Sequence, residues 1–162
     1  MISRDPILVL STNGLTGTVT NDDATAGSLG EIVTSTIPTG SAVAVTDSTP
    51  VNVTSISLTA GDWDVSGVVN FNLSGVTGTS FQSGVSLTTA TLPAQASGSG
   101  MGTDALASIP LVTTLLTGLH NMHINPVRIK LAATTTVYLV AKQALTVGTS
   151  VAFGTIRARR MR

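Results

Sequence analysis

The residues of this chain best suited to metal binding or acid–base chemistry are its two histidines, His120 and His123. If they lie in a β-strand, their spacing places them on opposite faces. The chain has no cysteine, and no acidic residue nearby completes a zinc site or a hydrolase triad. We therefore expect ordinary core or surface histidines, no metal, no cofactor and no catalytic residue.

A pair of carboxylates, Asp62 and Asp64, flanks Trp63 and superficially resembles the paired acids of a glycosidase. Such an enzyme also needs a cleft with stacking aromatic rings. The whole chain offers one Trp, one Tyr and three Phe, so we expect these aspartates to lie in turns or on a solvent face. An enzyme is not predicted.

Basic residues gather at the C-terminus, where Arg157, Arg159, Arg160 and Arg162 follow one another closely. No aromatic residue is interleaved with them, and the formal net charge of the chain is zero, which argues against nucleic-acid binding. All acidic residues precede residue 105, and seven of the eight basic residues follow it. We expect Arg157, Arg159 and Arg160 to contact acidic residues of a neighbouring subunit.

The composition combines 42% hydrophobic residues with only 10% charged residues, and the mean hydropathy is +0.41. No apolar run is long enough to cross a bilayer, so no membrane contact is expected. Without cysteine, stability must come from packing. So much apolar surface is unusual for a free monomer, and it predicts that the chain packs against copies of itself as a homotrimer.

Alternating hydrophobicity identifies the clearest element, a half-buried β-strand over residues 63–73. Its predicted core side chains occupy odd positions: Trp63, Val65, Val69, Phe71 and Leu73. Further strands are expected at residues 32–37, 43–45, 51–58, 81–87, 111–116, 119–124, 127–131, 136–144 and 150–158, with a hairpin at Gly75–Gly78 and a loop from Pro93 to Asp104.

These signals predict an all-β antiparallel jelly-roll sandwich of about 8–10 strands, without a convincing helix. Residues 27–162 would form the sandwich, and residues 1–26 a short N-terminal arm with one apolar patch, Ile7, Leu8, Val9 and Leu10. That patch is too short for the core of a signal peptide, so synthesis in a cytoplasm without export is expected.

Four runs of sequence resemble a widespread family of tailed-bacteriophage virion proteins: Gly27–Val33, Val51–Gly67, Thr135–Ala141 and Gly154–Arg160. The most specific of these runs is Val51–Gly67, and the block Ala60–Val65 within it is also loosely similar to a strand of trimeric jelly rolls of the complement C1q and tumour-necrosis-factor type. The resemblance covers about residues 27–162. It implies a non-enzymatic homotrimer on a virion, made in the bacterial host cytoplasm.

Family members occur as small separate proteins and as the ends of longer tail fibres. Fibre-borne members carry a long N-terminal stalk, whereas only about 26 residues precede the matching region here. We therefore expect a head decoration, cement or head-fibre protein, whose arm anchors it to the major capsid protein. The alternative is a tail-fibre tip that binds a host receptor, against which the scarcity of aromatic residues counts.

Overall fold

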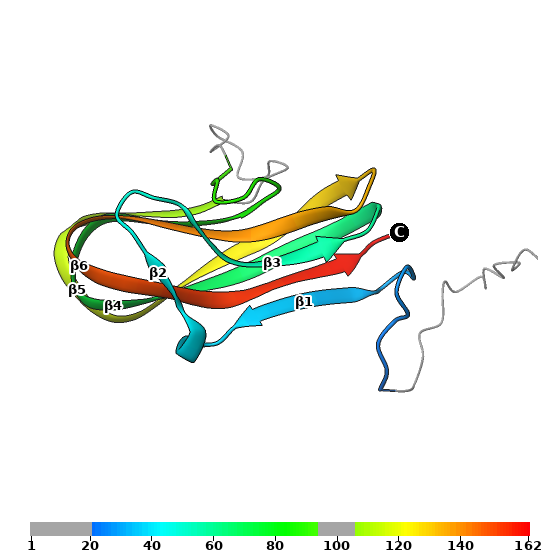
Figure 1. Ribbon diagram of the computed structural model, residues 1–162, viewed down its shortest axis with the longest axis horizontal. Coiled ribbons are helices and arrows are strands. Elements are labelled where there is room, and N and C mark those ends of the chain that lie inside the picture. Colours follow the sequence, from blue (N-terminus) through cyan, green and yellow to red (C-terminus); the bar gives the residue numbers. More distant parts are fainter. Residues whose placement is uncertain (1–20, 94–105) are drawn as a thin grey trace, which may run out of the picture.

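The computed structural model describes residues 21–93 and 106–162, and nearly all regular structure in them is β (Figure 1). Three strands are short and three have 26 residues each. In chain order they are β1 (Ile32–Ile37), β2 (Val43–Val45), β3 (Val51–Leu58), β4 (Gly61–Ser86), β5 (Leu106–Leu131) and β6 (Thr135–Arg160), with a 3-10 turn η1 (Thr39–Ser41) between β1 and β2.

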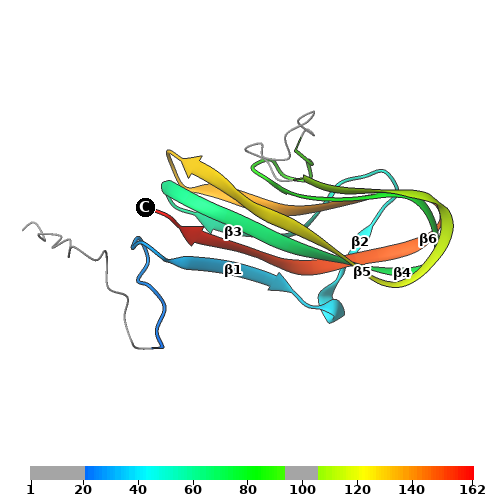
Figure 2. The same cartoon turned by 180° about the vertical axis from the view of Figure 1, so that it is seen from behind.

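The strands form one antiparallel sheet that folds over on itself. Its order is β1-β6-β4-β5, and β2 and β3 pair with the same edge of β6 as β1. Each long strand bends back near its middle, so that its two halves lie in facing layers (Figures 1 and 2). The prediction of an all-β antiparallel sandwich is confirmed.

We name the two layers by the strand halves that pair in them. Layer A contains β1 and residues 61–73 of β4, 118–131 of β5 and 150–160 of β6. Layer B contains β3 and residues 77–86 of β4, 106–116 of β5 and 135–147 of β6. The turns between β3 and β4 and between β5 and β6 cross from one layer to the other at the end opposite the bend, here called the open end (Figure 1).

A left-handed glycine marks the bend in each long strand. These are Gly75 in β4 (φ 58°), Gly118 in β5 (φ 102°) and Gly148 in β6 (φ 97°). Gly148 has a second reason to be glycine, because a Cβ atom there would lie 2.6 Å from the carbonyl oxygen of Gly75. Left-handed backbone is unfavourable for residues with a Cβ, so these glycines allow continuous strands to turn back.

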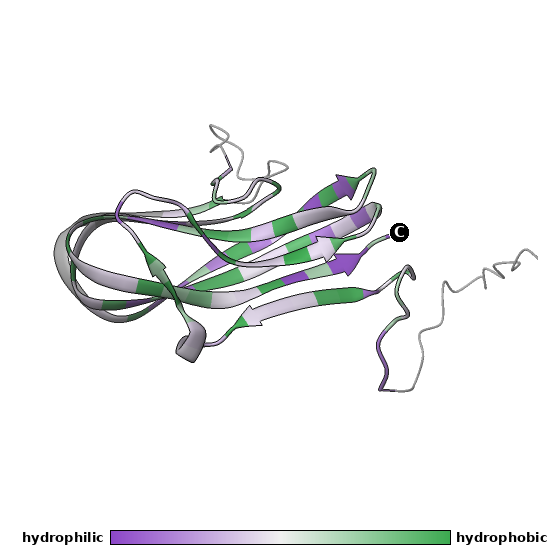
Figure 3. Cartoon of the chain, in the orientation of Figure 1, coloured by the Kyte–Doolittle hydropathy of each residue, from purple (hydrophilic) through white to green (hydrophobic). Residues whose placement is uncertain are grey.

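The hydrophobic core fills the space between the layers. Its side chains come from alternate positions of each strand, because every second side chain points between the layers. Trp63, Val65, Val69, Phe71 and Leu73 are all buried, with exposed fractions of 2% or less. At the bend, a register shift between Leu73 and Val76 moves the buried side chains from odd to even positions, so that Val76 is buried. Hydrophobic and hydrophilic bands consequently alternate along the ribbons in Figure 3.

Side-chain hydrogen bonds join the two layers at the bend and along one side of the sandwich. Gln143, which is fully buried, donates from Nε2 to the carbonyl oxygen of Val45 (2.7 Å) and accepts a hydrogen bond from Ser150 in the opposite half of β6. On the side, Oγ of Ser35 in β1 lies 2.6 Å from Oγ1 of Thr54 in β3. These bonds hold the two layers in a fixed relation.

The structure corrects how the expected strands connect. The hairpin predicted at Gly75–Gly78 is wrong, because β4 continues through this segment with irregular register. The segments expected at 111–116, 119–124 and 127–131 merge into β5, and those at 136–144 and 150–158 merge into β6. The sequence pattern predicted turns at glycine and small polar residues, but in the structure these residues lie at bends within continuous strands. Most of the loop predicted at Pro93–Asp104, and all of Ile7, Leu8, Val9 and Leu10, lie outside the described residues.

Alanine at Gly148 tests the origin of the bend. We expect Gly148→Ala to lower the free energy of unfolding by more than about 2 kcal/mol, since it adds overlap with the β4 backbone to the cost of left-handed alanine. Gly118→Ala is the matched control, because a Cβ atom there meets nothing within 4 Å. Urea unfolding measures both variants, and equal losses would contradict this account of Gly148.

Candidate functional site

Charged residues concentrate at the open end of the sandwich, around the inward-facing side chain of Arg160. The guanidinium carbon lies 4.2 Å from the ring centroid of Trp63, its cross-strand partner. Nε donates to Glu31 (2.8 Å), and the other nitrogens donate to the carbonyl oxygen of Ala60 (3.1 Å) and to Oγ1 of Thr59 (2.5 Å). Arg160 thus closes the end of the core with a cation–π contact and an ion pair.

This arrangement corrects the prediction for Arg160. Its side chain is 6% exposed and its donors are used within the chain, so it is not available as an intersubunit charge. Arg157 and Arg159 are exposed on the outer face of layer A. The three arginines separate because successive residues of a strand alternate between faces, and Arg160 shares the buried face of Ile156 and Ala158.

Glu31 connects the residues before β1 to this cluster. Its carboxylate accepts hydrogen bonds from Arg160 and from the backbone nitrogen of Gly27 (2.8 Å each), and its side chain is 13% exposed. The bond from Arg160, followed by the bond from Gly27, lowers the pKa of Glu31 below its ordinary value. Glu31 therefore fixes the point at which residues 21–30 leave the sandwich.

A second ion-pair group lies beside the first, centred on Asp62. Its carboxylate accepts a two-point contact from Arg128, with Nε to Oδ1 at 2.7 Å, and a bond from Nε of Arg162 at 3.0 Å. Arg128 foremost, and then Arg162, hold the pKa of Asp62 well below its usual range. The expectation of a turn or solvent-face role is wrong for Asp62, which is 5% exposed, whereas Asp64 lies half-buried on the outer face of layer A.

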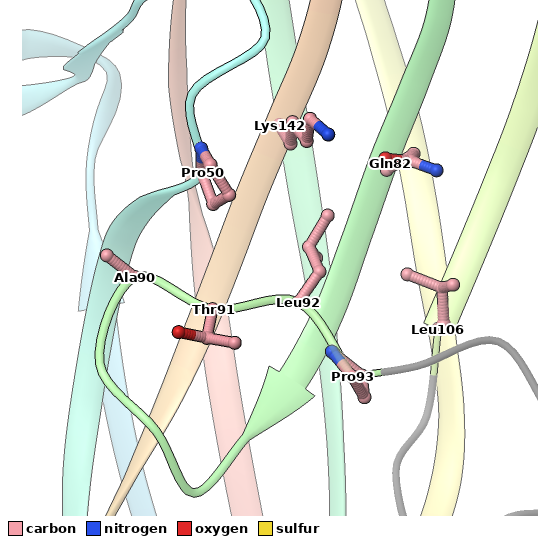
Figure 4. Close-up of a pocket in the computed structure, with 8 residues that line it drawn as sticks. All are labelled: Pro50, Gln82, Ala90, Thr91, Leu92, Pro93, Leu106 and Lys142. Carbon is pink, nitrogen blue, oxygen red and sulfur yellow. The ribbon is translucent and has the colours of Figure 1, made fainter.

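An open pocket of about 340 Å³ lies on the outer side of layer B (Figure 4). Residues 90–93 run over the strands there and form one wall. Asn52 holds this segment, because its side-chain amide donates to Thr89 and accepts from the backbone nitrogen of Ala90 (2.7 Å each). The polar side chains that line the pocket are Lys142 and Gln82 on the strands and Thr91 in the loop wall.

The two histidines lie on opposite faces of β5. His120 lies half-buried and parallel to the ring of Phe81, with centroids 6.3 Å apart, while His123 is exposed on the other face of β5. Within residues 21–93 and 106–162, no three residues of the types His, Cys, Asp and Glu gather closely enough to hold a metal ion. No helix in this part of the chain is long and apolar enough to cross a membrane.

Comparisons with known proteins give a distant likeness of fold. No family model matches the chain, and no curated protein matches it. Among solved structures, a chain from infectious bursal disease virus, Gx strain, aligns at 14% identity over 81% of this chain and 32% of that chain, with a TM-score of 0.46. A chain of the VP2 subviral particle of infectious bursal disease virus aligns at 15% identity over 82% of this chain and 30% of its own, with a TM-score of 0.44.

This chain spans about a third of the length of those two viral chains. With both TM-scores below 0.5, the likeness carries no argument about family or function.

Replacing Glu31 tests the closure of the open end through pH. A lowered folded-state pKa means that the carboxylate contributes stability above the unfolded pKa of about 4.3, and that this contribution disappears as pH falls through the folded value. We expect Glu31→Gln to be less stable than the native chain at pH 7, with the difference shrinking below about pH 4. Urea unfolding across pH measures the difference, and a difference that stays constant below about pH 4 would contradict this account of Glu31.

Proposed function

We propose that the protein is a non-enzymatic structural component of a tailed-bacteriophage virion, displayed as a homotrimer that decorates or cements the head. The observation that carries the proposal is the long free edge of β5. This strand has 26 residues and pairs with β4 alone among the described strands. An unpaired edge of that length presents backbone N–H and C=O groups to another chain.

Features of β5 limit where such an edge can pair. Pro110 and Pro126 lie within the strand and have no N–H to donate. The residues between them keep their donors, and that stretch passes through the bend. We infer that copies of the chain associate beside this stretch, which agrees with a composition of only 10% charged residues.

The placement of aromatic side chains favours a head role over receptor binding. Trp63, Phe71 and Phe81 are buried, while Tyr138 and Phe153 are half-buried. These five are all the aromatic residues of the chain, so no fully exposed ring is available to stack on a glycan. Receptor binding at a tail-fibre tip stays the alternative function, with the pocket beside Lys142 as its place.

The remaining assignments are part of the same proposal. Residues 27–162 act as the trimeric sandwich, and residues 1–26, with Ile7, Leu8, Val9 and Leu10, anchor it to the major capsid protein. An apolar segment outside the packed core can order on docking to a partner. The protein would be made in the host cytoplasm and end in the virion.

Mass and truncation test the assembly. Light scattering coupled to size exclusion should report three chains of 16.4 kDa each. Deletion of residues 1–26 should leave this trimer intact but prevent its incorporation into virions. A stable monomer would contradict the assembly, and normal incorporation of the truncated chain would place the attachment in the sandwich.

Virions without the protein distinguish head from tail. For a head decoration we expect normal adsorption to host cells and faster loss of particle integrity on heating or chelation, because the trimer supplies only shell contacts. The matched control is the same virion with the protein added back. Lost adsorption with unchanged head stability, together with competition by the purified trimer for cells, would instead establish the fibre-tip role.

A further inference from the structure

The outer face of layer A divides into a basic half and an apolar half. The basic half lies toward the open end, where Arg157 and Arg159 of β6 and Arg128 and Lys130 of β5 are exposed. The register places Asp64 of β4 opposite both Arg159 and Arg128. Figure 2 shows these strands side by side, and Figure 3 shows hydrophilic bands at the ends of β5 and β6.

The basic half has fewer acidic than basic groups. Asp62, the neighbouring acid, is already engaged in ion pairs within the chain. None of the ion pairs formed between described residues includes Lys130, Arg157 or Arg159. Like charges held on one rigid sheet face repel each other, so carboxylates from a partner would lower the free energy of this surface.

The apolar half lies nearer the bend. Val151 and Phe153 of β6 and Val68 of β4 point outward and remain half-buried, and Leu119 of β5 is 57% exposed. Val68 and Phe153 are diagonal neighbours, because Phe153 lies opposite Asn70. The outer face of a sheet that meets only water normally carries polar residues at such positions.

We propose that the outer face of layer A is a docking surface for an acidic protein surface, with the apolar half supplying apolar contacts and the basic half selecting the partner. The inference deepens the proposed function, since it assigns the face and the partner chemistry by which the protein would meet the virion. Aromatic residues and arginine are enriched at protein interfaces, and Phe153 and Arg157 lie on the same outward face of β6. Small ligands instead require a concave site.

The charge pattern also decides between possible partners. Two copies meeting through this same face would bring Arg157 and Arg159 against either like charges or the apolar half of the other copy, and neither supplies carboxylates, which disfavours a symmetric contact between copies. A nucleic acid would satisfy the basic half but would leave Val68, Val151 and Phe153 without apolar contacts. An acidic protein surface satisfies both halves.

The test uses the full-length chain and two probes, poly-L-glutamate and a DNA duplex of random sequence. We expect poly-L-glutamate to bind at low salt and to dissociate as salt rises. Arg157→Glu should weaken that binding by about tenfold. Lys142→Glu changes the net charge equally but lies on layer B, and it should change the affinity by less than about twofold. Equal losses in both variants, no binding by the native chain, or tighter binding of the duplex would each overturn the proposal.

Rebinding to virion heads that lack the protein completes the test. Phe153→Ser should reduce rebinding while leaving poly-L-glutamate binding unchanged, whereas Arg157→Glu should reduce both. If the native chain and both variants rebind equally, the docking face is wrong while the proposed function stands. If the native chain does not rebind, the proposed function fails, and the poly-L-glutamate comparison decides the charge selectivity of the face by itself.

Discussion

The fold depends on three long strands that each serve both layers of the sandwich. Because β4, β5 and β6 pass continuously around the bend, the register chosen in layer A constrains the register in layer B. A slip of one residue would turn the apolar side chains of a strand outward. The irregular register near Val76 and the left-handed Gly75, Gly118 and Gly148 allow the reversal without breaking the strands.

A buried charge completes the core where the hydrophobic side chains end. Arg160 covers Trp63, binds the β3–β4 turn through Thr59 and Ala60, and pairs with Glu31. Removing one partner of such a buried pair leaves an uncompensated charge, so the pair is costly to break. The same contacts determine where the N-terminal residues leave the sandwich, which couples the proposed anchoring arm to a rigid part of the molecule.

The two proposed contacts use different surfaces of the chain. The free edge of β5 is the proposed site of association with further copies, and the outer face of layer A is the proposed docking surface for a different partner. Layer B is partly covered by residues 90–93, and its pocket is open and sparsely polar. The contacts proposed for assembly are therefore spread over a strand edge and a sheet face of the described residues.

The local sequence pattern determined most of the strands of this protein and the face on which many of their side chains lie. Alternation predicted five of the buried side chains of β4, those from Trp63 to Leu73, and nearly all strand segments, because a half-buried strand imposes a period of two on its sequence. Ile156 and Ala158 occupy alternate, buried positions of β6, and continuing this alternation to the next even position would also have predicted a buried Arg160. The sequence could not show that Gly148 continues a strand instead of ending one, since a left-handed glycine suits both a turn and a bend.

Tertiary structure alone decided which distant residues meet. Glu31 is 129 residues from Arg160, and Asp62 is 66 residues from Arg128, so no local pattern pairs them. Their pairing follows from the strand order β1-β6-β4-β5, which brings the start of β1 and the end of β6 to one end of the sandwich. Local sequence therefore set the face on which each side chain lies, through backbone geometry, whereas the folding over of the sheet set its neighbours, through the packing of two layers around one core.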